Sequence, residues 1–301
     1  MTLEERLSEC KICPHECKVN RFIKRGRCNA SSELKVSLVS IHDYEEPPIS
    51  GKNGSGTIFF SNCNLKCVYC QNYRISHEGL GKEISIDRLA DIMIEEQERG
   101  VENINLVTPT MYAYHIIEAI KIAKKKGLKI PIVYNTSGYE SVETLKDLEG
   151  YIDIYLTDFK YAVDTLSKRY SNVNDYADKT KLAILEMKRQ CKDTFDENGK
   201  MLTGVIIRHM ILPNNIENTK QVIKWIKETL GENTIISIMA QYFPEYKAKI
   251  DDFKEINRKI TKEELEEIED YLFQENMING YIQELGEHEE EYVPDFNLEN
   301  V

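Results

Sequence analysis

Residues 63–72, with the sequence Cys-Asn-Leu-Lys-Cys-Val-Tyr-Cys-Gln-Asn, bring three thiols together within eight positions. Cys63, Cys67 and Cys70 follow an apolar run at 57–60, which favours a strand that leads into the cysteine loop. Three thiols leave a tetrahedral metal ion or a four-iron cluster one protein ligand short, and such an open position can bind a reactant. Buried, unligated thiols are the alternative, but the polar residues between the cysteines and their tight spacing favour a reactive metal site.

A second cysteine group lies nearer the start of the chain, in Cys10-Lys-Ile-Cys13-Pro-His-Glu-Cys17 and at Cys28. The spacing is C-x2-C-x3-C-x10-C, and four thiols can hold either zinc or an iron–sulfur cluster; the spacing does not separate the two. Basic residues in the same segment would offset the charge of a thiolate–metal centre, although a solvated basic loop is the alternative. We expect a small metal-stapled N-terminal subdomain, because so short a segment buries little apolar area by itself.

The composition excludes several classes of protein. The 301 residues are 41% hydrophobic, which supports one large domain or one large and one small domain. The net charge of −12 disfavours nucleic-acid binding through a general basic surface. No apolar run is long enough for a membrane span, and the acidic first residues do not resemble a secretion signal. Eight cysteines in such a chain indicate reduced thiols and metal ligation, so we expect a cytoplasmic protein.

Beyond the cysteine loop, apolar strand patterns alternate with amphipathic helix patterns. This alternation predicts a parallel sheet with helical crossovers, as an open sheet or a barrel. The six predicted strands lie at Thr57–Phe60, Ile104–Val107, Ile130–Tyr134, Tyr151–Leu156, Gly204–Leu212 and Thr234–Met239.

Polar residues follow the predicted strands at their carboxyl ends, where α/β folds place their working side chains. The segment 108–110 ends the second strand, and Asn135, Asp158, Lys160 and Arg208 lie at or near the ends of later ones. Cationic, acidic and amide groups at one edge suit a zwitterionic small molecule.

Three other features have less decisive patterns. His42, Glu45 and Glu46 could form an active-site or metal-ligand group, but a hydrogen-bonded structural role for His42 is favoured. The segment 292–296 could dock onto the domain, whereas the acidic run at 287–291 is most simply solvated. Cys191 stands alone and is expected to be structural.

The pattern Cys63-x3-Cys67-x-Tyr69-Cys70 resembles the signature of the radical S-adenosylmethionine (SAM) superfamily, including the aromatic residue before the third cysteine. The stretch 63–72 is similar to the activating enzymes of pyruvate formate-lyase and other glycyl radical enzymes. Further stretches at 13–17, 49–51, 54–60 and 134–139 are closer to the PflX-like iron–sulfur proteins. The resemblance covers about residues 10–245.

The resemblance implies a partial (β/α)6 barrel with a [4Fe-4S] cluster on Cys63, Cys67 and Cys70. SAM would bind the fourth iron, with Tyr69 near the adenine. Reductive cleavage of SAM would give a 5′-deoxyadenosyl radical that abstracts hydrogen from a substrate. The positions that match SAM-binding or nearby cation-binding residues of the activating enzymes are Asn135, Asp158, Lys160 and Arg208.

The sequence also departs from the family pattern. Residues 108–110 are Thr-Pro-Thr where many members carry Gly-Gly-Glu, and Asn135 replaces an acid of the activating enzymes. The resemblance implies a reduced flavodoxin or ferredoxin-type electron donor, and a glycyl radical enzyme ranks ahead of a small molecule or peptide as substrate. A noncatalytic electron carrier or zinc scaffold is the alternative. We predict three parts: an N-terminal subdomain at 1–50, the radical SAM core at 51–245 and an acidic helical extension at 246–301.

Overall fold

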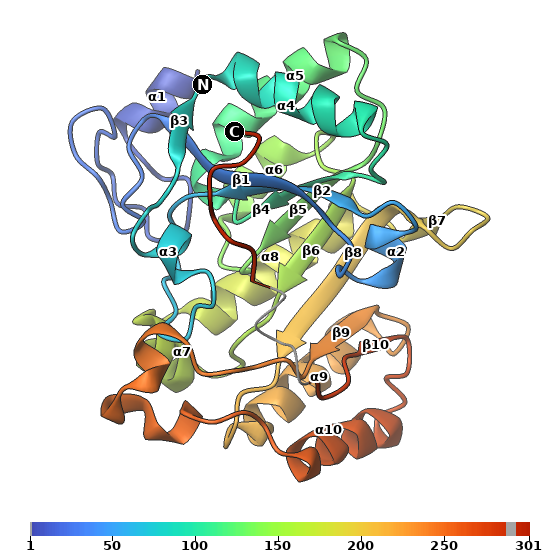
Figure 1. The fold of residues 1–301 in the computed structure, drawn as a ribbon. Helices are drawn as coiled ribbons and strands as arrows, with labels where there is room; N and C mark the ends of the chain where they lie inside the picture. The colour runs from blue at the N-terminus through green and yellow to red at the C-terminus, as the bar shows by residue number, and fades with distance from the viewer. Residues whose placement is uncertain (1, 287–292) are drawn as a thin grey trace.

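The computed structural model describes residues 2–286 and 293–301. Its centre is one curved sheet with strand order β10-β9-β8-β6-β5-β4-β2-β1-β3, and β7 pairs with β8 beside this path (Figure 1). The strands from β2 to β10 along this order run parallel, whereas β1, β3 and β7 pair antiparallel with their neighbours. The strand bounds are β1 Leu34–His42, β2 Ser55–Phe60, β3 Lys82–Ile84, β4 Ile104–Val107, β5 Ile132–Thr136, β6 Ile154–Asp158, β7 Thr194–Phe195, β8 Met201–Met210, β9 Ile236–Met239 and β10 Gly280–Ile282.

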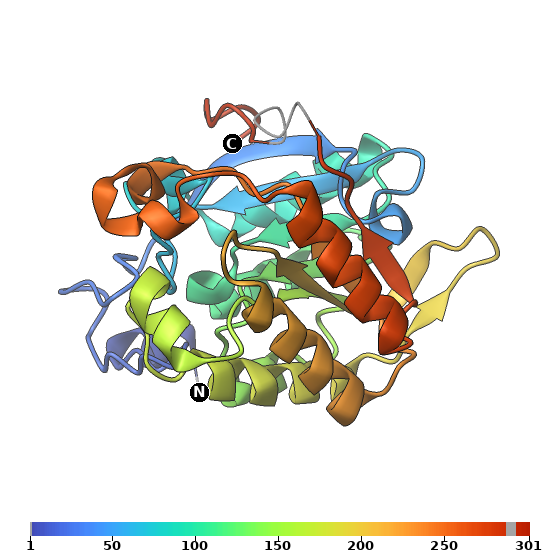
Figure 2. The same ribbon diagram turned by 90° about the horizontal axis from the view of Figure 1, so that it is seen from below.

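Helices follow the parallel strands and cover the outer, convex side of the sheet (Figures 1 and 2). In α9, for example, Val222, Ile223 and Ile226 are buried, while lysines occupy the other face, so the 3.6-residue period directs one stripe to the core. The helices are α1 Leu3–Ser8, α2 Pro47–Ser50, α3 Tyr73–Ser76, α4 Ile86–Glu98, α5 Ala113–Lys125, α6 Val142–Leu148, α7 Asp164–Ser171, α8 Tyr176–Gln190, α9 Ile216–Leu230 and α10 Lys262–Gln274, with 3₁₀ turns at Thr110–Tyr112, Tyr246–Lys249 and Asp251–Ile256.

The fold prediction is confirmed: six strand–helix units form an open parallel sheet, the partial (β/α)6 barrel. The sheet does not close, since β3 and β10 form its two edges. The structure adds β10, a seventh parallel strand that the sequence pattern does not predict. A Cβ on Gly280 would lie 1.9 Å from the Ile236 carbonyl oxygen, so only glycine allows β10 to approach β9 this closely.

The cysteine-rich N-terminal segment packs against the sheet instead of standing apart from it. Leu7 and Ile12 belong to the main hydrophobic core. Arg21 is 3% exposed, and its guanidinium donates to the carbonyl oxygens of Met111 and Ser31. The division of the chain at residues 50 and 245 stays a prediction.

The last described segment, 293–301, passes over β1 (Figure 1). Phe296 is buried against Phe59 with ring centroids 5.6 Å apart, and the Val39 amide donates to the Glu299 carbonyl oxygen at 3.1 Å. The expected docking is therefore confirmed for 293–296. Tyr292 and the acidic run at 287–291 lie outside the described residues.

Within residues 2–286 and 293–301, each helix is either too short or too polar to cross a lipid bilayer.

Candidate functional site

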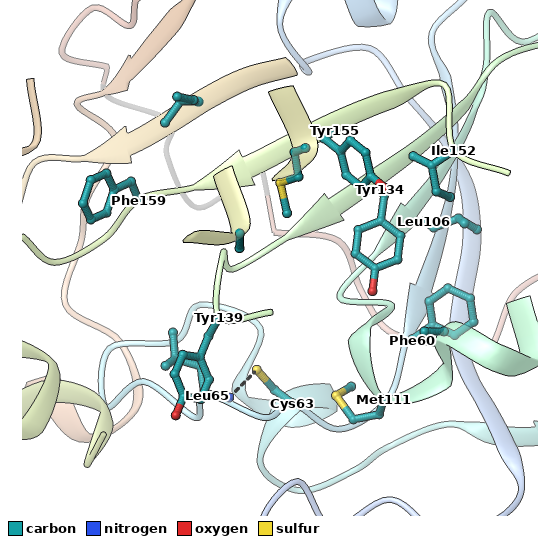
Figure 3. Close-up of a cluster of buried hydrophobic side chains, with 14 of the residues drawn as sticks. Phe60, Cys63, Leu65, Leu106, Met111, Tyr134, Tyr139, Ile152, Tyr155 and Phe159 are labelled. Atoms are coloured by element: carbon teal, nitrogen blue, oxygen red, sulfur yellow. Dashed lines mark hydrogen bonds between the residues drawn. The ribbon is translucent and has the colours of Figure 1, made fainter. Parts of the chain in front are cut away.

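The loop with Cys63, Cys67 and Cys70 begins three residues after β2, at the carboxyl edge of the parallel strands. All three thiols line one cavity of about 170 Å³, which we call the cysteine cavity. Cys63 and Cys67 are buried and Cys70 is half-buried. Figure 3 shows Cys63 beside Leu65, whose amide donates to the Cys63 sulfur at 3.4 Å. The structure thus brings together the three cysteines that the sequence singled out.

Hydroxyl groups contact the other two thiols. The Ser171 hydroxyl donates to the Cys67 sulfur at 3.2 Å, and the Ser76 hydroxyl lies 3.1 Å from the Cys70 sulfur. Burial raises the pKa of Cys63 to about 11 and that of Cys70 to about 12, and the nearby thiols add to both shifts. Three neighbouring thiolates therefore need a positive centre to stabilise them, as iron would.

These residues fit an iron–sulfur cluster better than a single ion. In the described part of the chain, no three Cys, His, Asp or Glu side chains converge on one point as ligands of a single metal ion do. Each cysteine of a cubane binds a different iron, so the thiols can surround a shared cavity without converging on one point. Donor hydroxyls and amides around the sulfurs also suit a cluster, whose potential such hydrogen bonds tune.

Tyr69 also lines the cysteine cavity. Its hydroxyl lies 2.8 Å from that of Tyr161, and its ring contacts Tyr170 and Tyr242 edge to face. The Tyr161 hydroxyl in turn contacts Ser171, which donates to Cys67. The aromatic residue of the motif is thus part of a buried network that ends on a thiol, and its contact with adenine stays a prediction.

The four polar residues predicted at the strand ends form one hydrogen-bonded network, which we call the polar wall. Arg208 is its centre: Nε donates to Asp158 Oδ1 at 3.1 Å, and Nη2 donates to Asn135 Oδ1 at 2.6 Å. Lys160 Nζ lies 2.6 Å from Asp158 Oδ2. A fifth member, Glu45, accepts from Arg208 Nη1 at 3.2 Å and from the Asn135 amide at 3.2 Å.

Charge pairing fixes the ionisation of the wall. Burial alone would raise the pKa of Asp158, but Lys160 and Arg208 hold that pKa below its usual value. Burial would likewise lower the pKa of Lys160, and the Asp158 carboxylate raises it instead. For Glu45, burial outweighs the attraction of Arg208 and raises the pKa. The wall therefore pairs two cations with two acidic side chains in a nearly dry setting.

Asn135 is an amide for a visible reason. Its oxygen accepts from Arg208 while its nitrogen donates to Glu45, and a carboxylate at this position could not donate. A close approach also positions Asp158: a Cβ on Gly138, at φ +80°, would lie 2.1 Å from the Asp158 carbonyl oxygen. Close backbone packing between the residues after β5 and the end of β6 thus fixes the position of Asp158 in the polar wall.

Four members of the polar wall border two cavities. Asn135, Asp158, Lys160 and Arg208 line the cysteine cavity and also a second one of about 180 Å³. This second cavity is further lined by His42, Glu45, Glu46, Gln241, Gln283 and Pro294. The sequence carries only a weak signal for Glu45 and Glu46, namely their position after a strand and before two prolines.

The segment 108–110 is Thr-Pro-Thr and so has no acid of its own, but its Thr110 binds a glutamate from elsewhere in the chain. Thr108 lines the cysteine cavity, and its backbone has a left-handed conformation with φ +58°. Thr110 donates at 2.5 Å to the buried Glu140, which also accepts from Thr136. Burial raises the pKa of Glu140 to about 7. Glu140 is not among the residues that line the cysteine cavity.

The N-terminal cysteines lie close to one another. Burial raises the pKa of Cys13 well above its usual value, and the charges of Cys28 and Cys10 add to the shift. The Arg27 amide donates to the Cys17 sulfur at 3.4 Å and the Ala30 amide to the Cys28 sulfur at 3.5 Å. Cys191 lies apart, buried at the end of α8 with its sulfur 3.6 Å from the Ile152 carbonyl oxygen.

The model of the radical SAM superfamily matches residues 57–179, which include the three-cysteine loop. Two related proteins come from Methanocaldococcus jannaschii. The uncharacterized protein MJ0674 is 35% identical over 267 residues, which cover 85% of this chain and 72% of that protein. The uncharacterized protein MJ0808 is 24% identical over 265 residues, which cover 81% of this chain and 73% of that protein.

Two solved structures also match. Streptococcus suis SuiB bound to S-adenosylmethionine has 18% identity and a TM-score of 0.48, and the match covers 75% of this chain and 46% of SuiB. This chain therefore spans less than half of SuiB. Methylornithine synthase (PylB) has 13% identity and a TM-score of 0.49, with 75% of this chain and 69% of PylB covered.

Proposed function

Because this chain belongs to the radical SAM superfamily, we propose that it is an enzyme that cleaves SAM reductively and removes a hydrogen atom from a substrate. One observation carries the proposal: three cysteines and four members of the polar wall line the same cavity. When bound, a [4Fe-4S] cluster and SAM supply a 5′-deoxyadenosyl radical.

The residues of this chain have distinct tasks in the proposal. Cys63, Cys67 and Cys70 would hold the cluster and leave one iron open. Arg208 and Lys160 would attract the SAM carboxylate, and Asp158 would attract its amine. Burial of the thiols and of the wall excludes water, which strengthens these charge interactions and protects a radical from solvent.

Anaerobic reconstitution with iron and sulfide, followed by dithionite and SAM, tests the proposal. We expect 5′-deoxyadenosine and methionine in equal amounts. A protein that carries a full cluster complement yet forms no 5′-deoxyadenosine would overturn it. Zinc alone in both cysteine groups, without SAM binding, would support a noncatalytic scaffold instead.

A glycyl radical enzyme is our first candidate substrate, on the strength of the likeness of residues 63–72 to activating enzymes. Incubation with candidate glycyl radical enzymes, followed by EPR, tests this assignment. A glycyl doublet that requires both SAM and this protein supports it. Deoxyadenosine formation without any doublet would favour a small molecule or a peptide.

For the electron donor we propose a reduced flavodoxin or ferredoxin-type protein that binds the N-terminal segment. Residues 10–28 contain six Lys or Arg and one Glu, a net charge of +5 in a chain of −12. Phe22 and Ile23 are 52% and 85% exposed at the tip of this segment. Such a surface suits an acidic partner, so the rate of cluster reduction should fall as salt rises. A rate independent of salt would contradict this docking.

We further propose that Cys10, Cys13, Cys17 and Cys28 hold a second metal centre, either zinc or iron–sulfur; zinc would require these thiols to draw together, since no three of them converge on one point in the described chain. Its support is the grouping of four thiols with two amide donors in a basic segment. Metal analysis of the Cys10→Ser variant would show the loss of one centre only. We place the protein in the cytosol, where cysteine thiols stay reduced and are therefore available to bind a metal.

A further inference from the structure

The second cavity contains a buried carboxyl group that the polar wall does not neutralise. Two cations and two carboxylates of the wall, Arg208, Lys160, Asp158 and Glu45, balance one another. Glu46 is an additional acid beside them. It is 8% exposed, and its Oε2 atom is buried with no hydrogen-bond partner among the described residues.

The surroundings of Glu46 offer little compensation. Burial raises its pKa, while the charge of Arg208 and a hydrogen bond with Ser237 act in the opposite direction. Burial lowers the pKa of His42, which lines the same cavity, so that side chain is neutral near pH 7. The Gln283 side-chain oxygen, also on the cavity wall, is a second buried acceptor without a partner among the described residues. Two residues of the cavity lining, Glu46 and Gln283, thus each carry a buried acceptor atom without a partner among the described residues.

The cavity is small and is covered on one side by the last segment of the chain. Its volume of about 180 Å³ is below what drug-sized ligands need, so a guest would be compact. Val293 and Pro294 form part of its lining, and Phe296 anchors them by packing against Phe59. Met239 from β9 and Phe59 from β2 add apolar surface for the carbon skeleton of a guest.

We propose that this cavity is the substrate site and that the substrate carries an ammonium group, which pairs with Glu46. The proposal rests on the proposed radical function, which supplies the reason for a guest beside the cysteine cavity. An ammonium group would supply the positive charge and the donors that Glu46 and Gln283 lack. Its carbon skeleton would then lie against the polar wall, on the side opposite the proposed cofactor.

NMR binding measurements on the full, cluster-reconstituted chain test the site without any turnover. The probes are n-butylammonium, the neutral n-butyramide and the anionic butyrate. With methionine methyl groups labelled with ¹³C, n-butylammonium should shift the Met239 signal and leave that of Met93, in the α4 core, unchanged. We expect the ammonium probe to bind about tenfold or more tightly than the amide.

The Glu46→Gln variant should reduce this selectivity by about tenfold, because it keeps the shape and removes the charge. Glu143→Gln, on the exposed first turn of α6, is the matched control and should bind as the natural chain does. Equal binding of ammonium and amide by the natural chain would overturn the proposal, even if Glu46→Gln failed to fold. Unchanged selectivity in a folded Glu46→Gln variant would overturn it as well.

The two proposals fail separately. Selective ammonium binding at Met239 by a protein that forms no deoxyadenosine would support this site and contradict the radical function. Deoxyadenosine formation by a protein without ammonium selectivity would contradict this site alone.

Discussion

The imidazole Nε2 of His15 lies 2.8 Å from the carbonyl oxygen of Asn64, the residue that follows Cys63. Burial lowers the pKa of His15, so the ring is neutral near pH 7 and Nε2–H donates to the carbonyl. Asn64 also donates from its side chain to the Tyr139 carbonyl oxygen, and the Tyr139 ring contacts His15 edge to face. One cysteine group is thus tied directly to the other.

Replacement of His15 by Phe should loosen the cysteine loop while keeping the ring contact with Tyr139. Loss of the hydrogen bond leaves the Asn64 carbonyl oxygen unpaired and should cost about 1–2 kcal/mol of unfolding free energy. We also expect less iron and sulfide per chain after reconstitution. Lys24→Ala, exposed in the same segment, is the control, and equal cluster contents in both variants would contradict the link.

Serine at Cys63, Cys67 or Cys70 should abolish deoxyadenosine formation, because a hydroxyl is a poor substitute for a thiolate on iron. Iron content and the absorbance of the cluster, measured together with product, check this. Cys191→Ser should keep its cluster, since that thiol is buried at the end of α8 and contacts a backbone carbonyl. A variant of the three that still cleaves SAM would remove that residue from the ligand set.

Asn135→Asp should destabilise the polar wall. The new carboxylate cannot donate to Glu45 and would lie beside it as a like charge, which should cost about 1–3 kcal/mol. We expect the variant to unfold at a lower urea concentration and to bind SAM more weakly. Asn233→Asp, on an exposed loop, is the matched control. Equal stabilities for the two variants would show that the amide has no special role.

Glu140 should make stability fall as pH rises. Its pKa of about 7 in the folded protein lies above the ordinary 4.5, so the folded state binds the proton more tightly. The stabilisation from this group is fully present below about pH 4.5. As the pH rises to about 7, the free energy of unfolding falls by roughly 3 kcal/mol. Glu140→Gln should remove this fall from the pH profile of urea unfolding. Glu143→Gln should not, and identical profiles for all three proteins would refute the shift.

Phe296→Ala should release the last segment without unfolding the domain. The Val39 amide donates to Glu299, so its hydrogen exchange should accelerate in the variant. The Ile223 amide inside α9 serves as reference and should exchange at its original rate. Protection of Val39 that survives the substitution would mean that other contacts hold the segment.

Most of the fold could be predicted because its signals are local. Apolar periodicity predicted the Ile104–Val107 strand at its observed bounds. The strands predicted at 130–134 and 151–156 are shifted by two or three residues, since their polar last residues, such as Asn135 and Asp158, continue the ladder. β10 was missed because three residues of an edge strand carry almost no pattern.

Apart from the three cysteines, which their spacing singles out, the site was predictable only where a strand-end rule applied. Asn135, Asp158, Lys160 and Arg208 come from parallel strands, so the rule groups them at one edge of the sheet on sequence alone. Glu45 and Glu46 follow β1, which runs antiparallel to β2, and their position in the sheet depends on long-range packing. Whether a wall has one or two cavities beside it is likewise a property of the folded chain alone.

Because Asn135, Asp158, Lys160 and Arg208 border both cavities, a guest in one must influence the other through the same four side chains. Any guest that draws Arg208 or Asp158 toward itself alters the field on the opposite side. By thermodynamic linkage, if SAM changes the affinity for a substrate by some factor, the substrate changes the affinity for SAM by that same factor. Through a wall of this kind, whichever of SAM and the substrate binds first changes the affinity for the other.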